Sequence, residues 1–189
     1  MSSLMLQENT SIIEDIKWSN KENDILASCG SDGAVRIWDC RCNARKCVAH
    51  VLASDSSVGV ISWSQNRPLI LSGSDLGEIK IWDLRVLGLD CPSSAFFNYH
   101  QKEITSIEWH PSESTIFAAS SDDNQITLWD LSAEECDDSD EQAGVLPPQL
   151  MFIHMGQKEI KEIHWHRQYP GLIGSVDIDG YNLFKASNV

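Results

Sequence analysis

The chain has 189 residues, of which 42% are hydrophobic and 8% aromatic, so it can fold around a core and is not intrinsically disordered. Its formal net charge is −14, and residues 103–157 contain twelve acidic residues without one Lys or Arg. A surface with this charge repels phosphate backbones and anionic lipid and attracts basic proteins. We therefore expect no direct nucleic-acid binding, no membrane association and a cationic protein partner.

The first eleven residues have neither a basic region nor a long apolar run. No other stretch approaches the roughly 20 apolar residues that cross a bilayer. We expect the chain to stay on the cytosolic or nuclear side, with its six cysteines reduced.

The dominant pattern along the chain is a unit that occurs four times: a strand ending in Trp, a polar turn, a second strand, an Asp-containing turn and a third strand ending in Trp-Asp. The intervals between the first-strand tryptophans are 45, 46 and 56 residues, and these tryptophans are Trp18, Trp63, Trp109 and Trp165. The third strands end in Trp38-Asp39, Trp82-Asp83, Trp129-Asp130 and, in the fourth unit, Phe184-Lys185. This period is typical of WD repeats, each of which forms one blade of a β-propeller.

The segments between these landmarks are short and rich in β-branched and aromatic residues, which predicts strands at 58–63, 69–72, 78–82, 104–109, 116–119 and 125–129. Outer strands are expected at 45–53, 94–100 and 148–156. Helical spacing of apolar residues is absent from the pattern.

The repeats divide the chain into blade 1 (11–57), blade 2 (58–103), blade 3 (104–156, with an insertion at 134–148) and blade 4 (157–189). Blade 4 is incomplete because its outer strand is lacking. The segment 1–10 contains a candidate ring-closing strand at 3–8. WD repeats suit rings of about seven blades, so we expect four blades of a larger, seven-bladed ring. Missing N-terminal blades or a second copy of the chain would close it.

The fourth unit carries the most specific sequence signal. Its characteristic runs are LPPQLMFIH at 146–154, KEIHWH at 161–166 and YPGL at 169–172. They resemble the glutamate-rich WD-repeat proteins of the ribosome-assembly branch, which are related to the retinoblastoma-associated histone-binding WD proteins. The runs SIIEDIKW at 11–18, VISWS at 60–64 and SIEWHP at 106–111 support the resemblance, which extends from about Ser11 to Val189.

The resemblance implies a non-enzymatic scaffold in the nucleus and nucleolus. Such a protein acts as a ribosome-biogenesis factor that escorts a basic ribosomal protein, or as a histone-binding chaperone. The glutamate-rich N-terminal segment and the first blades of the family are not in this sequence.

An acidic insertion interrupts blade 3 between its third and outer strands. A run of one charge is commonly a solvated loop, but here Pro-Pro gives it a rigid exit that can hold carboxylates in place. In the related histone-binding proteins a matching loop grips a basic helix. The predicted partner-binding residues are Glu134, Glu135, Asp137, Asp138, Asp140, Glu141, Pro147 and Pro148.

A set of polar residues in blade 3 has the residue types of a hydrolase triad. We interpret it instead as a hydrogen-bonded network that stabilises the blade, because related sets recur in other repeats and no nucleophile motif accompanies it. The predicted network is His100, Ser120, Asp122 and Trp129, with partial copies in Ser72, Asp75 and Trp82 and in His154 with Asp177.

Two further motifs have weaker functional readings. The spacing of Cys40, Cys42, Cys47 and His50 is compatible with zinc, but these residues straddle a turn, and we expect no metal. The triplet Arg41, Arg45 and Lys46 is compatible with RNA or an acidic tail, and more commonly caps a strand. Phosphate-binding glycine motifs are absent, so we expect no cofactor.

Three functions remain as alternatives from the sequence. The favoured one is the assembly factor or chaperone that holds a basic client. A general WD adaptor of a ubiquitin-ligase or signalling complex is the alternative, and a propeller hydrolase is the third.

Overall fold

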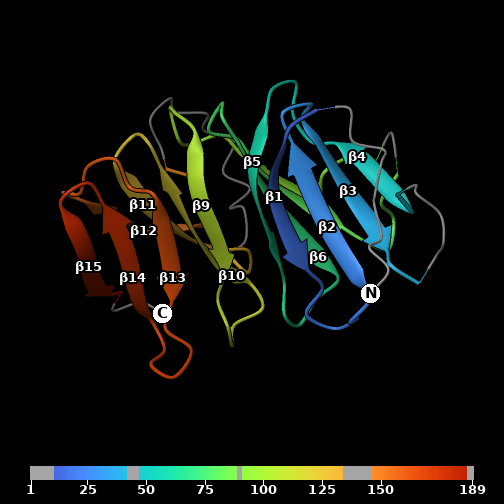
Figure 1. The fold of residues 1–189 in the computed structure, drawn as a ribbon. Coiled ribbons are helices and arrows are strands. Elements are labelled where there is room, and N and C mark those ends of the chain that lie inside the picture. The colour runs from blue at the N-terminus through green and yellow to red at the C-terminus, as the bar shows by residue number, and fades with distance from the viewer. Residues whose placement is uncertain (1–10, 42–46, 89–90, 134–145, 187–189) are drawn as a thin grey trace, which may run out of the picture.

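The computed structural model describes residues 11–41, 47–88, 91–133 and 146–186, which form four antiparallel sheets (Figure 1). The sheets confirm the predicted all-β propeller architecture with four blades. Blade 1 contains β1 (Ile13–Trp18), β2 (Ile25–Gly30), β3 (Ala34–Asp39) and β4 (Ala49–Leu52). Blade 2 contains β5 (Val58–Trp63), β6 (Leu69–Ser74), β7 (Ile79–Asp83) and β8 (Ala95–Phe97). Blade 3 contains β9 (Ile104–Trp109), β10 (Ile116–Ser121), β11 (Gln125–Asp130) and β12 (Leu150–Met155). Blade 4 contains β13 (Glu162–Trp165), β14 (Leu172–Asp177) and β15 (Gly180–Lys185).

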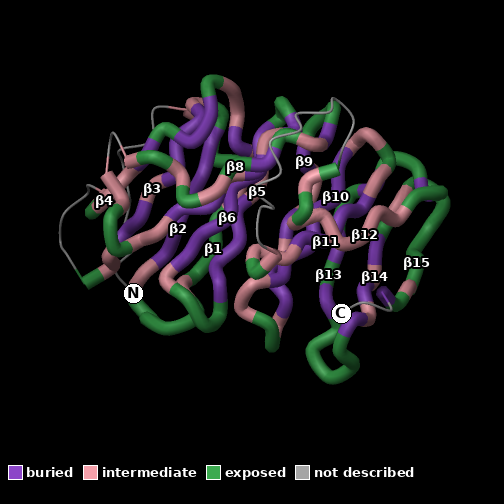
Figure 2. Tube along the Cα trace, turned by 180° about the vertical axis from the view of Figure 1, so that it is seen from behind, coloured by how far each residue is buried: buried purple, intermediate pink, exposed green. Residues whose placement is uncertain are grey.

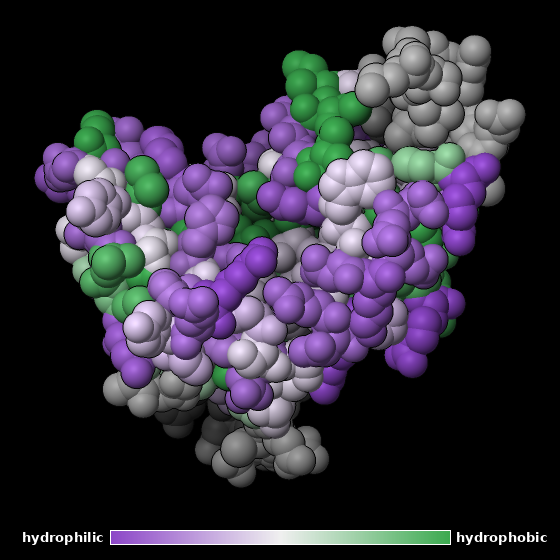
Figure 3. Space-filling view, turned by 60° about the horizontal axis from the view of Figure 1, so that its bottom comes forward, coloured by the Kyte–Doolittle hydropathy of each residue, from purple (hydrophilic) through white to green (hydrophobic). Residues whose placement is uncertain are grey.

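The blades stand side by side in an arc. The first strands of successive blades contact one another in the order β1, β5, β9, β13, so they line the inner side of the arc. Figure 3 shows the arc from its lower face, with a notch between its two ends. The candidate ring-closing strand at 3–8 lies outside the described residues. No helix in the described ranges is long and apolar enough to span a bilayer.

The hydrophobic core is divided among the three interfaces between adjacent blades. One cluster joins blades 1 and 2 through residues such as Cys29, Ile61 and Trp82, and two similar clusters join blades 2 and 3 and blades 3 and 4. The middle strands are buried along nearly their whole length, whereas β15 is largely exposed (Figure 2). Since each blade buries its faces against its neighbours, a single blade has little core of its own.

A tryptophan makes the same hydrogen bond at each of these interfaces. The indole N–H of Trp63 donates to the carbonyl oxygen of Lys17 at 3.0 Å. The indoles of Trp109 and Trp165 donate in the same way to Ser62 and Glu108, at 3.2 and 3.1 Å. In each case the acceptor belongs to the first strand of the preceding blade. These tryptophans therefore tie neighbouring blades together and are not exposed stacking platforms.

Close backbone contacts also join hairpin turns to the segments that lead into the next blade. Gly77 has φ +83°, and a Cβ atom there would lie 2.4 Å from the carbonyl oxygen of His100. Gly33 has φ +73°, and its Cβ would lie 2.1 Å from the carbonyl oxygen of Ser54. Only glycine fits both the left-handed conformation and this distance.

Candidate functional site

The two ends of the acidic insertion lie next to each other at the lower end of blade 3. The backbone N–H of Asp130 donates to the carbonyl oxygen of Gln149 at 2.8 Å, which joins the strand before the insertion to the segment after it. On the exit side, the N–H of Leu150 donates to the carbonyl oxygen of Pro147 at 2.9 Å. Pro148 is thus the second residue of a β-turn, the position where the fixed φ of proline is favoured. The insertion begins and ends at one fixed base.

The structure describes two of the predicted partner-binding residues, Pro147, which is half-buried, and Pro148, which is exposed. The acidic residues of the prediction lie outside the described residues, namely Glu134, Glu135, Asp137, Asp138, Asp140 and Glu141.

Beside the base of the insertion lies a groove of about 770 Å³, which we call the blade 2–3 groove. Blade 3 contributes Leu131, Ala133 and Gln149 to its lining. Blade 2 contributes Arg67, Ile81 and Ala95 among others. The acidic insertion continues directly from Ala133, so the groove and the insertion share a border.

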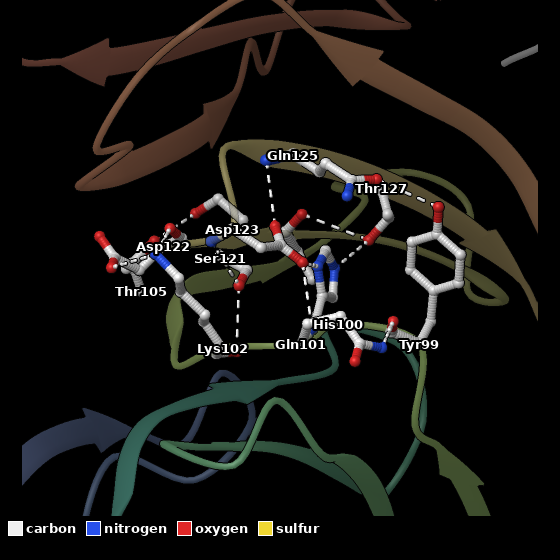
Figure 4. A network of polar contacts seen from close by, with 12 residues as sticks. Tyr99, His100, Gln101, Lys102, Thr105, Ser121, Asp122, Asp123, Gln125 and Thr127 are labelled. Carbon is white, nitrogen blue, oxygen red and sulfur yellow. Dashed lines mark hydrogen bonds and ion pairs between the residues drawn. The ribbon is translucent and has the colours of Figure 1, made fainter.

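The polar network of blade 3 is centred on the buried ring of His100 (Figure 4). Its Nδ1 lies 2.9 Å from Oδ2 of Asp123, and its Nε2 lies 2.8 Å from Oγ1 of Thr127. The indole N–H of Trp129 donates to the same Thr127 hydroxyl at 2.8 Å. With Nδ1 protonated, every donor in this series of hydrogen bonds has an acceptor. The network connects the loop before β9 with β11 and its turn.

Asp123 anchors the network at the hairpin turn. Burial alone would raise the pKa of its carboxyl, but the His100 ring and the backbone N–H groups of Gln101 and Gln125 hold this pKa below its usual range. The carboxylate is therefore charged at neutral pH and fixes the His100 ring.

Two residues of the predicted network do not take part in it. The hydroxyl of Ser120 contacts Oγ1 of Thr105 at 2.9 Å, and Asp122 contacts the ammonium of Lys102 at 3.5 Å. Side chains alternate between the two faces of a strand, and β10 places Ala119, not Ser120, opposite Thr127. Ser120, His100 and Asp122 thus do not form a catalytic arrangement.

Blades 1 and 2 contain a shorter version of this network. The indole N–H of Trp82 donates to the hydroxyl of Ser72 at 2.9 Å, so the structure brings these two predicted residues together. Asp75 stands apart and accepts from the hydroxyl of Ser56. Trp38 and Ser28 form the equivalent bond at 2.8 Å. In blade 3 the equivalent of these serines is Ala119, which is why Thr127 supplies the hydroxyl there.

Blade 4 lacks the indole, and the polar contacts between it and the outer strand of blade 3 differ. His154 contacts Gln157 at 3.1 Å, and its ring stacks on Phe184 with centroids 3.9 Å apart. Burial lowers the pKa of His154. Asp177, its predicted partner, instead accepts from the side chain of Asn182 at 2.9 Å. The predicted His154–Asp177 pair is not formed because Gln157 occupies the position beside the ring.

The cysteine and arginine motifs do not form a metal or anion site in the described residues. Sγ of Cys47 lies 3.7 Å from Nδ1 of His50, but no group of three or more potential ligands converges in the described ranges, and Cys42 is outside them. Nε of Arg41 donates to Asp39 at 2.9 Å, while Arg45 and Lys46 lie outside the description.

Sequence reasoning missed several residues that belong to the blade 3 network or line the groove. Asp123 and Thr127 were recoverable, because aligning the strands on Trp129 places Thr127 two residues before it on the same face. No local pattern distinguishes Arg67, since its position near Ala133 depends on how blades 2 and 3 are placed.

Four antiparallel blades, joined through tryptophans on their inner strands and with Ser–Trp or Thr–Trp pairs in the first three, define a WD-repeat β-propeller. Residues 3–148 match the family model described as "Nucleolar protein 10-like, N-terminal domain". The chain belongs to this β-propeller family.

The comparisons also confirm the resemblance to the glutamate-rich WD-repeat proteins. The chain is 45% identical to ribosome assembly protein rrb1 of Schizosaccharomyces pombe, in an alignment that covers 94% of this chain. It is 46% identical to glutamate-rich WD repeat-containing protein 1 of Dictyostelium discoideum, in an alignment that covers 95% of this chain. Identity to histone-binding protein MSI1 of Saccharomyces cerevisiae is 27%, over 65% of the chain and 29% of that protein. The first of these relatives is named for assembly and the third for binding, and none of the three is named for catalysis.

The chain spans 39% of the length of the first of these relatives and 38% of the second. A chain in the crystal structure of a mitotic checkpoint complex matches 96% of this chain with a TM-score of 0.77 at 19% identity. That match covers 50% of the other chain, and it shows the shared propeller fold.

Proposed function

We propose that this chain is part of a non-enzymatic scaffold that holds a basic protein client through the acidic insertion of blade 3. The observation that carries the proposal is the fixed base of the insertion, where Asp130 and Gln149 join its two ends. The insertion contains six acidic residues, and both of its ends are attached at this point. Exposed ion pairs are individually weak, so several of them acting together favour a strongly cationic client.

The client we favour is a ribosomal protein, with a histone as the second choice. Support comes from the 45% identity to a ribosome assembly protein, compared with 27% to a histone-binding protein. The nucleolar family description is consistent with a role in the nucleus and nucleolus. The two open ends of the arc are surfaces for further blades, supplied by the same polypeptide or by a second copy.

Charge reversal tests the role of the insertion. The variant carries Asp137→Lys, Asp138→Lys, Asp140→Lys and Glu141→Lys, and affinity for purified basic ribosomal proteins and for histones H3–H4 is measured by fluorescence anisotropy. We expect binding to fall by at least about tenfold, because several ion pairs are lost together. The control reverses four exposed acids elsewhere, namely Asp55, Glu103, Glu113 and Asp179.

An equal loss of affinity in the control variant would show that net charge alone accounts for binding, and would contradict a dedicated site in the insertion. Undiminished binding by the insertion variant would overturn the assignment. Affinity purification provides a second test: recovery of ligase subunits without ribosomal proteins or histones would favour a general adaptor.

A further inference from the structure

The loop that connects β9 to β10, at the lower end of blade 3, is closed by the ring of a buried histidine (Figure 1). His110 is 3% exposed, and its backbone N–H donates to the carbonyl oxygen of Ile116 at 2.9 Å. Its Nδ1 accepts from two backbone N–H groups of the same loop, that of Ser112 at 3.2 Å and that of Glu113 at 2.9 Å. A ring nitrogen that accepts hydrogen bonds carries no proton, so the ring is neutral and its proton is on Nε2.

The same ring is part of the interface between blades 3 and 4. It lies against the indole of Trp165, with ring centroids 4.6 Å apart in a T-shaped arrangement. Nε2 is buried and has no hydrogen-bond acceptor among the described residues. The indole N–H of Trp165 donates to the carbonyl oxygen of Glu108, so this tryptophan contacts blade 3 on both sides of the loop entrance. The His110 ring therefore joins the loop to the first strand of blade 4.

The corresponding position of the other three blades also accepts backbone N–H groups. In blades 1 and 2 the acceptors are the hydroxyls of Ser19 and Ser64, which do not titrate near neutral pH. In blade 4, Nδ1 of His166 accepts two N–H groups at 3.1 Å, but its ring is exposed. Among these four loops, all of which the structure describes, blade 3 alone combines an acceptor that titrates with burial at a blade interface.

Protonation of the His110 ring is opposed by its surroundings. Burial lowers the pKa of His110. A proton on Nδ1 would also face two N–H groups, so both hydrogen bonds would be lost. The indole of Trp165 attracts a cation, but that contact does not replace two hydrogen bonds and the lost hydration. The charged ring therefore has no stable place in the closed loop.

Few charged side chains adjoin the ring. Glu113, on the same loop, acts against burial and favours the charged form. β10 has no charged residue, and the titratable residues of β13 lie on its exposed face, where His164 contacts Glu162 and Glu108. Arg167, in the loop after β13, lines a hollow beside the His110 loop and disfavours a second positive charge there. Burial and the two N–H groups decide which form of the ring is stable.

We propose that His110 is a pH-sensitive switch that closes the β9–β10 loop and the adjoining interface with blade 4. At neutral pH the uncharged ring holds the loop closed and packs against Trp165. Below about pH 6.5, the usual histidine value, protonation requires the ring to leave this place, so the loop opens. Because the pKa is lower in the closed state, closure is complete above the usual value and is lost as the pH falls toward the lower one. The switch is independent of the acidic insertion and of the proposed client.

Hydrogen exchange measured by nuclear magnetic resonance at pH 7.5 and pH 5.5 tests the switch, after correction for the intrinsic exchange rate at each pH. We expect the protection of the Ser112 and Glu113 amides to fall by up to about tenfold, the ratio set by an open-state pKa of about 6.5. The Arg67 amide, which donates to the Ser64 hydroxyl, is the internal control and should keep its protection. A change of less than about twofold, or an equal change at Arg67, would overturn the proposal.

The protonation of the ring itself provides an independent test. Long-range correlation spectra of the histidine ring nitrogens at pH 7.5 should show His110 with a bare Nδ1 and a protonated Nε2. A proton on Nδ1 would contradict the switch, because the N–H groups of Ser112 and Glu113 would then have no acceptor.

A variant that cannot titrate locates the response. His110→Asn offers a carbonyl oxygen near the position of Nδ1, so the loop should stay closed while its pH response disappears. His166→Asn, the matched change at the exposed ring of blade 4, should leave the response of the His110 loop unchanged. A response that persists in His110→Asn would show that another group controls the loop. If His110→Asn does not fold, the ring spectra and the exchange of the wild-type protein decide the question by themselves.

Discussion

The three closed interfaces between blades and the two open faces at the ends of the arc are built from the same repeat but differ in burial. Trp63, Trp109 and Trp165 are 9%, 3% and 5% exposed, whereas Trp18, at the same position of blade 1, is 56% exposed. The sequence around these residues is similar. A neighbouring blade, and not the local sequence, therefore decides whether this tryptophan is core.

The outward face of blade 4 shows the same effect on the other end of the arc. Val176, Tyr181 and Leu183 are exposed there, while Ile173 and Phe184 on the opposite face of the same sheet pack against blade 3. Hydrophobic residues lie at both ends of the arc in Figure 3. At the closed interfaces, the corresponding hydrophobic residues are buried against the neighbouring blade.

The largest expected effect comes from removing a tryptophan at a closed interface. Trp109→Ala should lower the free energy of unfolding by about 3–5 kcal/mol, because it leaves a cavity and the carbonyl of Ser62 loses its indole donor. Trp18→Ala should cost less than about 1 kcal/mol, since that side chain is mostly in water. Urea unfolding followed by circular dichroism measures both. Equal losses would show that the exposed tryptophan is already part of a packed interface.

The next effect concerns the His100 network, which stabilises blade 3 from within. Asp123→Asn should lower the free energy of unfolding by about 1–3 kcal/mol at neutral pH, because a charged acceptor of buried hydrogen bonds is lost. Asp179→Asn, at an exposed turn, is the control.

The pH dependence of that loss has a defined sign. The pKa of Asp123 is lower in the folded state, so its stabilisation is complete above the unfolded value of about 3.9 and disappears as the pH falls through the lower folded value. The difference between wild type and Asp123→Asn should therefore narrow below about pH 4. A constant difference from pH 7 to pH 3 would contradict the role of the charge.

The four-blade architecture was predictable because each blade repeats the same alternation and the same Trp landmarks. The network in blade 3 was only partly predictable. Its His100 and Trp129 follow from the repeat, but the choice of Thr127 over Ser120 depends on strand register, and a shift of one residue reverses the face.

Features that join different blades were beyond the sequence pattern. The blade 2–3 groove brings Arg67 together with Ala133, 66 residues further along the chain, and its opening depends on an outer strand that begins only at Ala95. The repeat predicts an outer strand there but not its length. Similarly, the indole bond of Trp63 to the carbonyl of Lys17 requires the relative placement of two blades.

A smaller effect is expected at the open faces, and it concerns association more than stability. At high protein concentration the exposed apolar faces should cause the chain to associate reversibly. Ile16→Lys with Leu183→Lys should reduce the mass measured by light scattering and shift the free energy of unfolding by less than about 1 kcal/mol. A wild-type chain that remains monomeric at every concentration would contradict this use of the open faces.

The smallest effect is expected at a solvent-exposed ion pair in blade 2. Arg85 is bound to Asp83 in blade 2 and lowers the pKa of that carboxyl to about 2, but its side chain is 72% exposed. Arg85→Ala should return the pKa of Asp83 toward its usual range, measurable by nuclear magnetic resonance titration, and leave the free energy of unfolding almost unchanged, because the pair is screened by water. In blade 3 the equivalent Asp130 accepts from the backbone N–H and the hydroxyl of Ser132, so neutral donors can take the place of a cation at this position. A clear fall in the free energy of unfolding would contradict this and show that the exposed ion pair helps to stabilise the blade.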